Sequence, residues 1–157
     1  MIPRLVRSRI AAAAAVVALP VLLASCANSV GPEEREGREL AAAKAAWAAQ
    51  HLDSYTLVVR PVCYCGTASI RATVVNGAVT SRTFVETGTP VPDVQFGSVE
   101  TVDAMLATLE RAFEEDAAEV EADYDSRGIP QHASIDWYAN AIDDEFGWVV
   151  VELTPAP

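Results

Sequence analysis

The sequence predicts an α+β fold, in which two helices pack on a mostly antiparallel sheet of about six strands in the order α-β-β-β-α-β-β-β. Two observations lead to this prediction. Three runs with the alternation of strands follow each of two runs with helical periodicity. An Asn-Gly pair joins two of the strand runs, which is typical of an antiparallel hairpin. Runs of strands between single helices favour antiparallel pairing over a parallel sheet, and the equal order of the two halves is compatible with an internal repeat.

The first half predicts a helix and three strands, at residues 39–51, 55–62, 68–75 and 78–85. The helix is rich in alanine, the best helix former, and its spacing places Leu40, Ala43 and Trp47 on one face. The second and third strands form a hairpin around Asn76 and Gly77, because both residues of such a turn must take a positive φ.

The second half predicts a helix from 101 to about 115 and strands at 119–125, 131–137 and 148–153. Thr101 can cap the helix with its hydroxyl, and Asp103 in the first turn suits the helix dipole. Apolar residues that include Met105 and Phe113 recur at helical spacing, which predicts a face in the core. The last strand is a nearly continuous apolar run, so we expect it near the centre of the sheet.

Residues 1–25 predict a lipoprotein signal peptide. A basic segment is followed by an apolar run at 10–24 that falls short of the ~20 residues needed to span a bilayer as a helix. Leu23-Ala24-Ser25-Cys26 resembles the bacterial lipobox, and the resemblance implies cleavage before Cys26 and lipid transfer to its thiol. We therefore expect a protein anchored by lipid at Cys26 to the extracytoplasmic side of the cell membrane.

Residues 26–38 are expected to be the lipidated cysteine and a flexible tether, because Gly31, Pro32 and Gly37 interrupt them without apolar periodicity. The remaining residues, 39–157, are then a single α+β domain.

The mature chain is strongly acidic. Loss of Arg4, Arg7 and Arg9 with the signal peptide leaves 8 of the 11 basic residues against 22 acids, a net charge of −14. A protein this acidic does not gain affinity by neutralising phosphates, which excludes nucleic acid as a partner. The apolar residues make up 51% of the chain, which excludes a disordered protein.

One spaced set of residues resembles a known family. The set comprises Trp47, Tyr55, Cys63-x-Cys65, Gly77, Tyr124-Asp125, Gly128, Pro130, Ile135-Asp136 and Asp143-Asp144-Glu145. In order and spacing it is similar to the bacterial secreted and lipoprotein family called domain of unknown function family 6174, over about residues 45 to 153. Met105-Leu106 departs from the leucine and phenylalanine of that pattern. The resemblance supports the domain boundaries and implies no reaction.

Cys63 and Cys65 are the most informative candidate pair. A disulfide is the default in an exported protein, although residues i and i+2 of a strand lie ~6.6 Å apart, at the far edge of disulfide geometry. So short a ring would contribute only roughly 1.6 kcal/mol. A redox pair, two free thiols and a soft-metal site such as Cu(I) are the alternatives. Only Met105, His51 and His132 are available as a third copper ligand.

The acidic residues Asp136, Asp143, Asp144 and Glu145 are a weak candidate for calcium, which is bound by clustered carboxylates. Their spacing is not that of an EF-hand, and a solvated loop is the simpler interpretation.

No residue pattern predicts a catalytic site or a bound cofactor. The leading hypothesis is a non-enzymatic binding or interaction module of the cell envelope, whose partner is an envelope protein or a small ligand. The alternative hypothesis is a redox or copper-handling lipoprotein that acts through Cys63 and Cys65.

Overall fold

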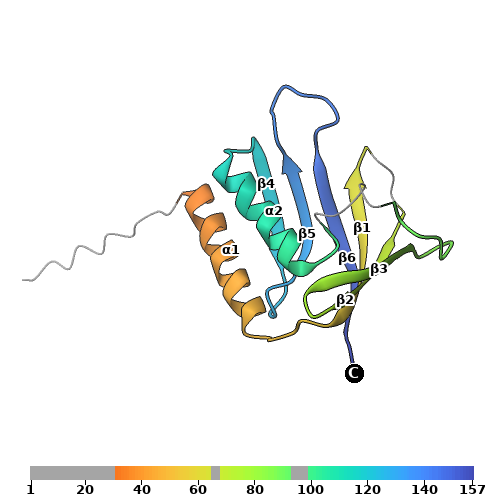
Figure 1. Ribbon diagram of the computed structural model, residues 1–157. Helices are drawn as coiled ribbons and strands as arrows, with labels where there is room; N and C mark the ends of the chain where they lie inside the picture. The colour runs from red at the N-terminus through yellow and green to blue at the C-terminus, as the bar shows by residue number, and fades with distance from the viewer. Residues whose placement is uncertain (1–30, 65–67, 93–98) are drawn as a thin grey trace, which may run out of the picture.

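The structure is a computed structural model that describes residues 31–64, 68–92 and 99–157. It contains two helices and one six-stranded antiparallel sheet, which confirms the predicted α+β fold (Figure 1). The elements are α1 (Pro32–Ala48), β1 (Tyr55–Cys63), β2 (Ile70–Val75), β3 (Ala78–Phe84), α2 (Val102–Glu114), β4 (Glu119–Tyr124), β5 (Pro130–Asp136) and β6 (Phe146–Pro155).

The strands lie in the order β3-β2-β1-β6-β5-β4, and every neighbouring pair is antiparallel. The long apolar strand β6 is central, as predicted, and β3 and β4 are the edges. The two halves have the same order of elements along the chain. In the sheet, however, β1, the first strand of the first half, lies beside β6, the last strand of the second half. An internal repeat therefore stays a prediction.

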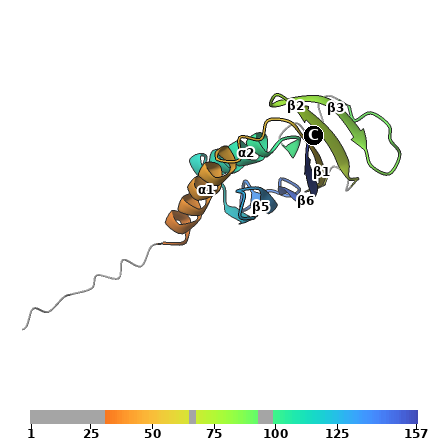
Figure 2. The ribbon, with the colours of Figure 1, turned by 90° about the horizontal axis from the view of Figure 1, so that it is seen from below.

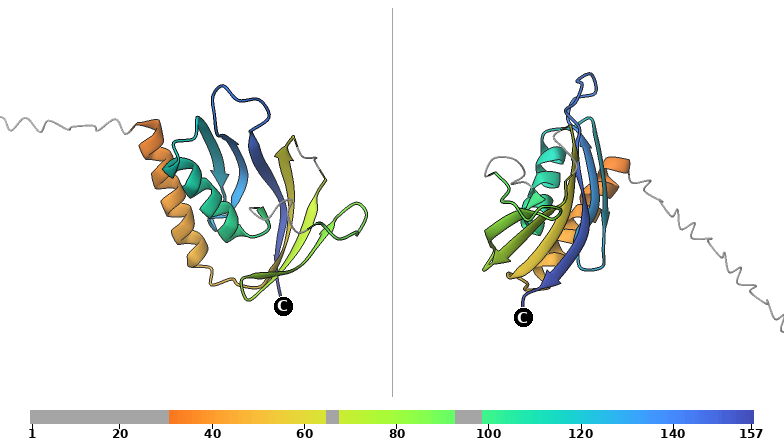
Figure 3. Two further views of the ribbon diagram at one scale, coloured as in Figure 1. Left: turned by 45° about the horizontal axis from the view of Figure 1, so that its top comes forward. Right: turned by 90° about the vertical axis from the view of Figure 1, so that its right-hand side faces the viewer.

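The helices cover one face of the sheet unevenly. α2 lies against the sheet, and α1 lies beside α2, out toward the β4 edge (Figures 2 and 3). Lys44 of α1 forms an ion pair with Glu110 of α2, and the indole nitrogen of Trp47 donates to Asp103 at 3.2 Å. These two contacts join the two helices.

The core lies between α2 and the sheet. The apolar face predicted for α1 is confirmed, since Leu40, Ala43 and Trp47 are all buried. The largest fully buried side chains elsewhere are Tyr55, Leu57, Ile70, Met105, Leu109, Ile129, Ile135 and Trp148.

Three local predictions are confirmed. Asn76 and Gly77 have φ values of 50° and 75°, as the hairpin turn requires. The Thr101 hydroxyl caps α2 by accepting a hydrogen bond from Ala104 N at 3.0 Å. Asp103 lies in the first turn of that helix.

The start of α1 corrects the prediction for residues 26–38. The helix begins at Pro32 in place of Glu39, so the second half of the expected tether is helical. Proline suits the first turn of a helix, because its φ is already helical and its missing N–H is not needed there. Ion pairs at i,i+4 spacing then join Arg35 to Glu39 and Glu34 to Arg38.

The turn between β4 and β5 packs directly against the backbone of α1. Gly128 has a φ of +84°, and a Cβ added there would lie 2.0 Å from the carbonyl oxygen of Ala43 and 2.7 Å from the nitrogen of Trp47. Only a glycine therefore fits at this position.

This contact gives a test with a matched control. We expect Gly128→Ala to lower the free energy of unfolding by ~2–5 kcal/mol, because backbone strain of ~1–2 kcal/mol adds to overpacking of ~1–3 kcal/mol. Gly88 has a φ of +69° and open space around it. Gly88→Ala should therefore show the strain alone. Urea unfolding of both variants measures the difference, and equal losses would mean that α1 is not held by this contact.

Candidate functional site

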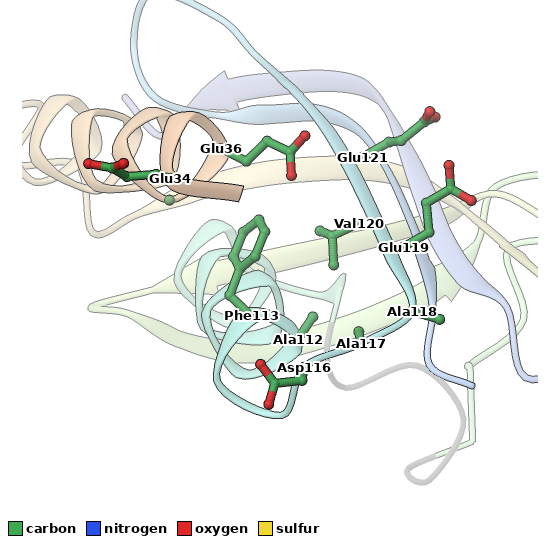
Figure 4. Close-up of a pocket in the computed structure, with 11 residues that line it drawn as sticks. Glu34, Glu36, Ala112, Phe113, Asp116, Ala117, Ala118, Glu119, Val120 and Glu121 are labelled. Atoms are coloured by element: carbon green, nitrogen blue, oxygen red, sulfur yellow. The ribbon is translucent and has the colours of Figure 1, made fainter. Parts of the chain in front are cut away.

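A hollow of about 670 Å³ lies where the start of α1, the end of α2 and the start of β4 meet (Figure 4). Its volume is within the range of ~300–1,000 Å³ that is usual for ligand pockets. Its floor is apolar. Phe113 and Val120 face one another across it, with Ala112 and Ala117 beside them. Sequence periodicity places Phe113 in the core, but the ring is only half-buried and its outer part lines the hollow.

Carboxylates surround this floor. Among the described residues, five acids line the hollow and no lysine, arginine or histidine does; the acids are Glu34, Glu36, Asp116, Glu119 and Glu121. Glu36 projects from α1 toward β4, and Glu119 and Glu121 project outward from β4 (Figure 4). Glu34 has an ion pair with Arg38 at 3.8 Å. Within the described residues, the other four acids form no salt bridge. We call this the acid-rimmed hollow.

Local structure explains where these acids lie. Alternation along β4 turns Val120 toward the helices and Glu119 and Glu121 away from them. Asp116 follows the end of α2 and has a positive φ of 53°. A carboxylate near a helix C-terminus meets the negative end of the helix dipole, which is unfavourable. The acids at this end of α2 therefore do not stabilise the helix.

A second, smaller hollow of about 380 Å³ lies between α1 and the second half of β4, and we call it the groove. Small side chains, Ala42, Ala46 and Ala122, line it together with Tyr124. Burial and, to a lesser extent, the nearby charges of Glu39 and Glu36 together raise the pKa of Tyr124 to about 12. Besides burial, the charges of these two α1 carboxylates therefore act on the groove.

The comparisons place this geometry in a family. A model for a family of unknown function, DUF6174, matches residues 39–155. The chain belongs to the DUF6174 family. No curated protein and no solved structure matches the chain. The match contains α2, the whole sheet and most of α1, so the DUF6174 domain supplies Asp116, Glu119 and Glu121. Glu34 and Glu36 precede the matched residues.

Several residues that carry the resemblance to DUF6174 build the scaffold beside the hollow. The Asp125 carboxylate accepts hydrogen bonds from Arg127 N at 2.9 Å and Ile129 N at 3.0 Å, which shapes the turn that presents Gly128 to α1. Trp47 and Tyr55 contact edge to face, with ring centroids 5.7 Å apart. These residues therefore position α1 and do not line the hollow.

The cysteine candidates are only partly described. Cys63 is the last residue of β1, is half-buried and lies opposite Phe146. It is not a free thiol. Cys65 lies outside the described residues, so the pairing stays a prediction. Of the additional copper ligands considered, Met105 is fully buried in the core.

The acidic loop between β5 and β6 does not assemble as a metal site. Asp136 and Asp144 both accept a hydrogen bond from Tyr138 N, at 3.1 Å and 2.8 Å, whereas Asp143 and Glu145 are exposed. Across the described ranges, no three His, Cys, Asp or Glu residues form a group that could hold a metal ion. The two half-buried carboxylates hold the loop in place.

Neither α1 nor α2 has the length and apolar character needed to cross a bilayer, and no other helix is described.

Tyr124 gives a prediction about alkaline pH. An unfolded tyrosine ionises near pH 10 and Tyr124 near pH 12, so the folded state resists loss of this proton. The resulting stability is complete below pH 10 and is lost as the pH rises toward 12. Between pH 10 and 12, the Tyr124→Phe variant should lose about 1–2 kcal/mol less free energy of unfolding than the wild type. This is less than the full pKa shift implies, because solvent screens the site. Urea unfolding at rising pH measures it.

The matched control is Glu39→Gln. Removal of this charge should lower the pKa of Tyr124 in a spectrophotometric titration. An unchanged titration would show that the charge of Glu39 does not act on Tyr124.

Proposed function

We propose that the protein is a lipid-anchored, non-enzymatic binding module of the bacterial cell envelope, and that its acid-rimmed hollow receives a basic partner. The observation that carries the proposal is the combination of an apolar floor with five carboxylates and, in the part of the chain that the structure describes, no basic lining residue. The Leu23-to-Cys26 motif supports the anchor.

The chemistry of the hollow defines the partner. An apolar side chain would fit between Phe113 and Val120, and flanking lysine or arginine side chains would reach Glu36, Asp116 and Glu119. Exposed ion pairs contribute only ~0.2–1 kcal/mol each, so the binding is expected to be weak and sensitive to salt. The charge of the rim would mainly accelerate association.

The binding proposal is tested with a capped Lys-Phe-Lys peptide at low ionic strength. Amide signals of Phe113 and Val120 should shift in an NMR titration. The double variant Glu36→Gln/Glu119→Gln should weaken binding by about 2–30-fold, the effect of losing two exposed pairs.

Glu152→Gln is the control, because Glu152 is exposed on β6 and is not among the residues of the hollow. Equal weakening in the control, or binding that does not respond to salt, would reject the hollow as the binding site.

The anchor is tested separately. Cys26→Ala should release the protein from the membrane fraction, or leave it held only by an uncleaved signal segment, because a diacylglyceryl group gives stable attachment. Wild-type protein should incorporate radiolabelled fatty acid. Absence of label in a host with a working lipoprotein pathway would overturn the anchor and would leave the binding proposal intact.

We also propose that Cys63 and Cys65 form a structural disulfide at the end of β1. The proposed export of the protein supports it, as does the observation that Cys63 is not a free thiol. Replacement of both residues by serine should cost less than ~2 kcal/mol in urea unfolding, because the closed ring is short. Thiol counting on the denatured protein checks the bond. A stability loss well above that value would mean that the pair is a major constraint on the fold.

A further inference from the structure

Three large apolar side chains are exposed at one end of the sheet. Tyr64 is 86% exposed, Tyr138 69% and Ile142 87%. Tyr64 directly follows β1, and the other two lie on the loop between β5 and β6. Because Cys63 pairs with Phe146, the first residue of β6, Tyr64 lies beside the base of that loop. We call these three residues the apolar tip.

The exposure of the tip is fixed by the loop. Tyr138 N donates to the carboxylates of both Asp136 and Asp144, and Ala141 N donates to the Tyr138 carbonyl at 2.8 Å. These bonds close a turn that directs the chain outward between Tyr138 and Ile142. Side chains of this size are normally buried, and a group of them exposed together is typical of an interaction surface.

The start of α1 lies at the same end of the molecule as the tip, whereas the Asn76-Gly77 hairpin and the C-terminus lie at the opposite end (Figures 1 and 3). Only residues 27–31 separate Cys26 from the first residue of α1. The six residue-to-residue steps from Cys26 to Pro32 span at most ~22 Å when fully extended. A lipid on Cys26 would therefore keep this end of the domain close to the bilayer.

We propose that the apolar tip contacts the lipid surface, with Tyr64, Tyr138 and Ile142 in the interfacial layer. The inference rests on the lipid anchor proposed above. Tyrosine favours this layer because its ring is apolar and its hydroxyl can stay hydrated. The anchor makes the contact intramolecular, so three side chains that would bind a membrane weakly on their own are held there at a high effective concentration.

Acidic residues limit the contact. Asp143 and Glu145 are exposed on the same loop, and anionic lipid repels them. The tip should therefore insert only its apolar side chains, and more deeply into neutral than into anionic bilayers at low salt.

The test uses the lipidated protein in phosphatidylcholine vesicles in which some acyl chains carry a quencher. An environment-sensitive fluorophore is attached at Ile142→Cys and, as a matched control, at Val75→Cys. Val75 is 42% exposed and lies next to the hairpin at the far end. Wild-type protein treated with the same reagent measures labelling of the native cysteines.

We expect the label at position 142 to shift to the blue and to lose about half of its fluorescence to the quencher, as a side chain in the interfacial layer would. The label at position 75 should not respond. Tyr64→Ser/Tyr138→Ser should restore most of the signal at position 142.

Flotation of the vesicles separates the two proposals. If the protein floats and the labels at 142 and 75 respond alike, the tip does not touch lipid and this inference is overturned, while the anchor stands. If the protein does not float, the anchor itself is wrong and the contact falls with it.

Discussion

The approach of two backbones at Gly128 is the constraint on which the arrangement of this protein depends. A side chain at that position would collide with the Ala43 carbonyl, so the β4–β5 turn can meet α1 only as glycine. Asp125 shapes the turn, and the Trp47–Tyr55 contact fixes the end of the helix from the other side. With that end held, the start of α1 extends to the β4 edge. There it forms one wall of the acid-rimmed hollow and determines where the preceding chain must leave the domain.

The distribution of charge argues that the hollow is more than a gap in the packing. At the start of α1, acids meet the positive end of a helix dipole and are favourable, but Asp116 meets the negative end of α2. The Asp116 carboxylate lowers the stability of α2 and has no ion-pair partner within the described residues. Such a charge is expected where it serves to bind a partner. The apolar tip is similar, because its exposure contributes nothing to the core. Both features lie at the end of the domain where α1 begins.

Much of the fold could be predicted from local sequence, because the decisive signals act over few residues. Asn76-Gly77 favours a tight hairpin turn, Thr101 caps the helix that follows it, and an apolar strand such as β6 is favoured at the centre of a sheet. The start of α1 could not be predicted in this way, since Gly31, Pro32 and Gly37 are typical of loops by composition. The acid-rimmed hollow was also missed. Phe113 and Val120 each have a core-like spacing, and only the position of α1 leaves them partly uncovered.

The edge position of β4 has a consequence for crowding. Lipid anchoring confines copies of a protein to two dimensions, where open strand edges meet more often and can pair into aggregates. Glu119, Glu121 and Asp123 alternate along the outer face of β4, so edge-to-edge pairing of two copies would bring three carboxylates against three others. The same charges that would attract a basic partner would thus disfavour pairing along this edge between copies held on a membrane by the proposed anchor.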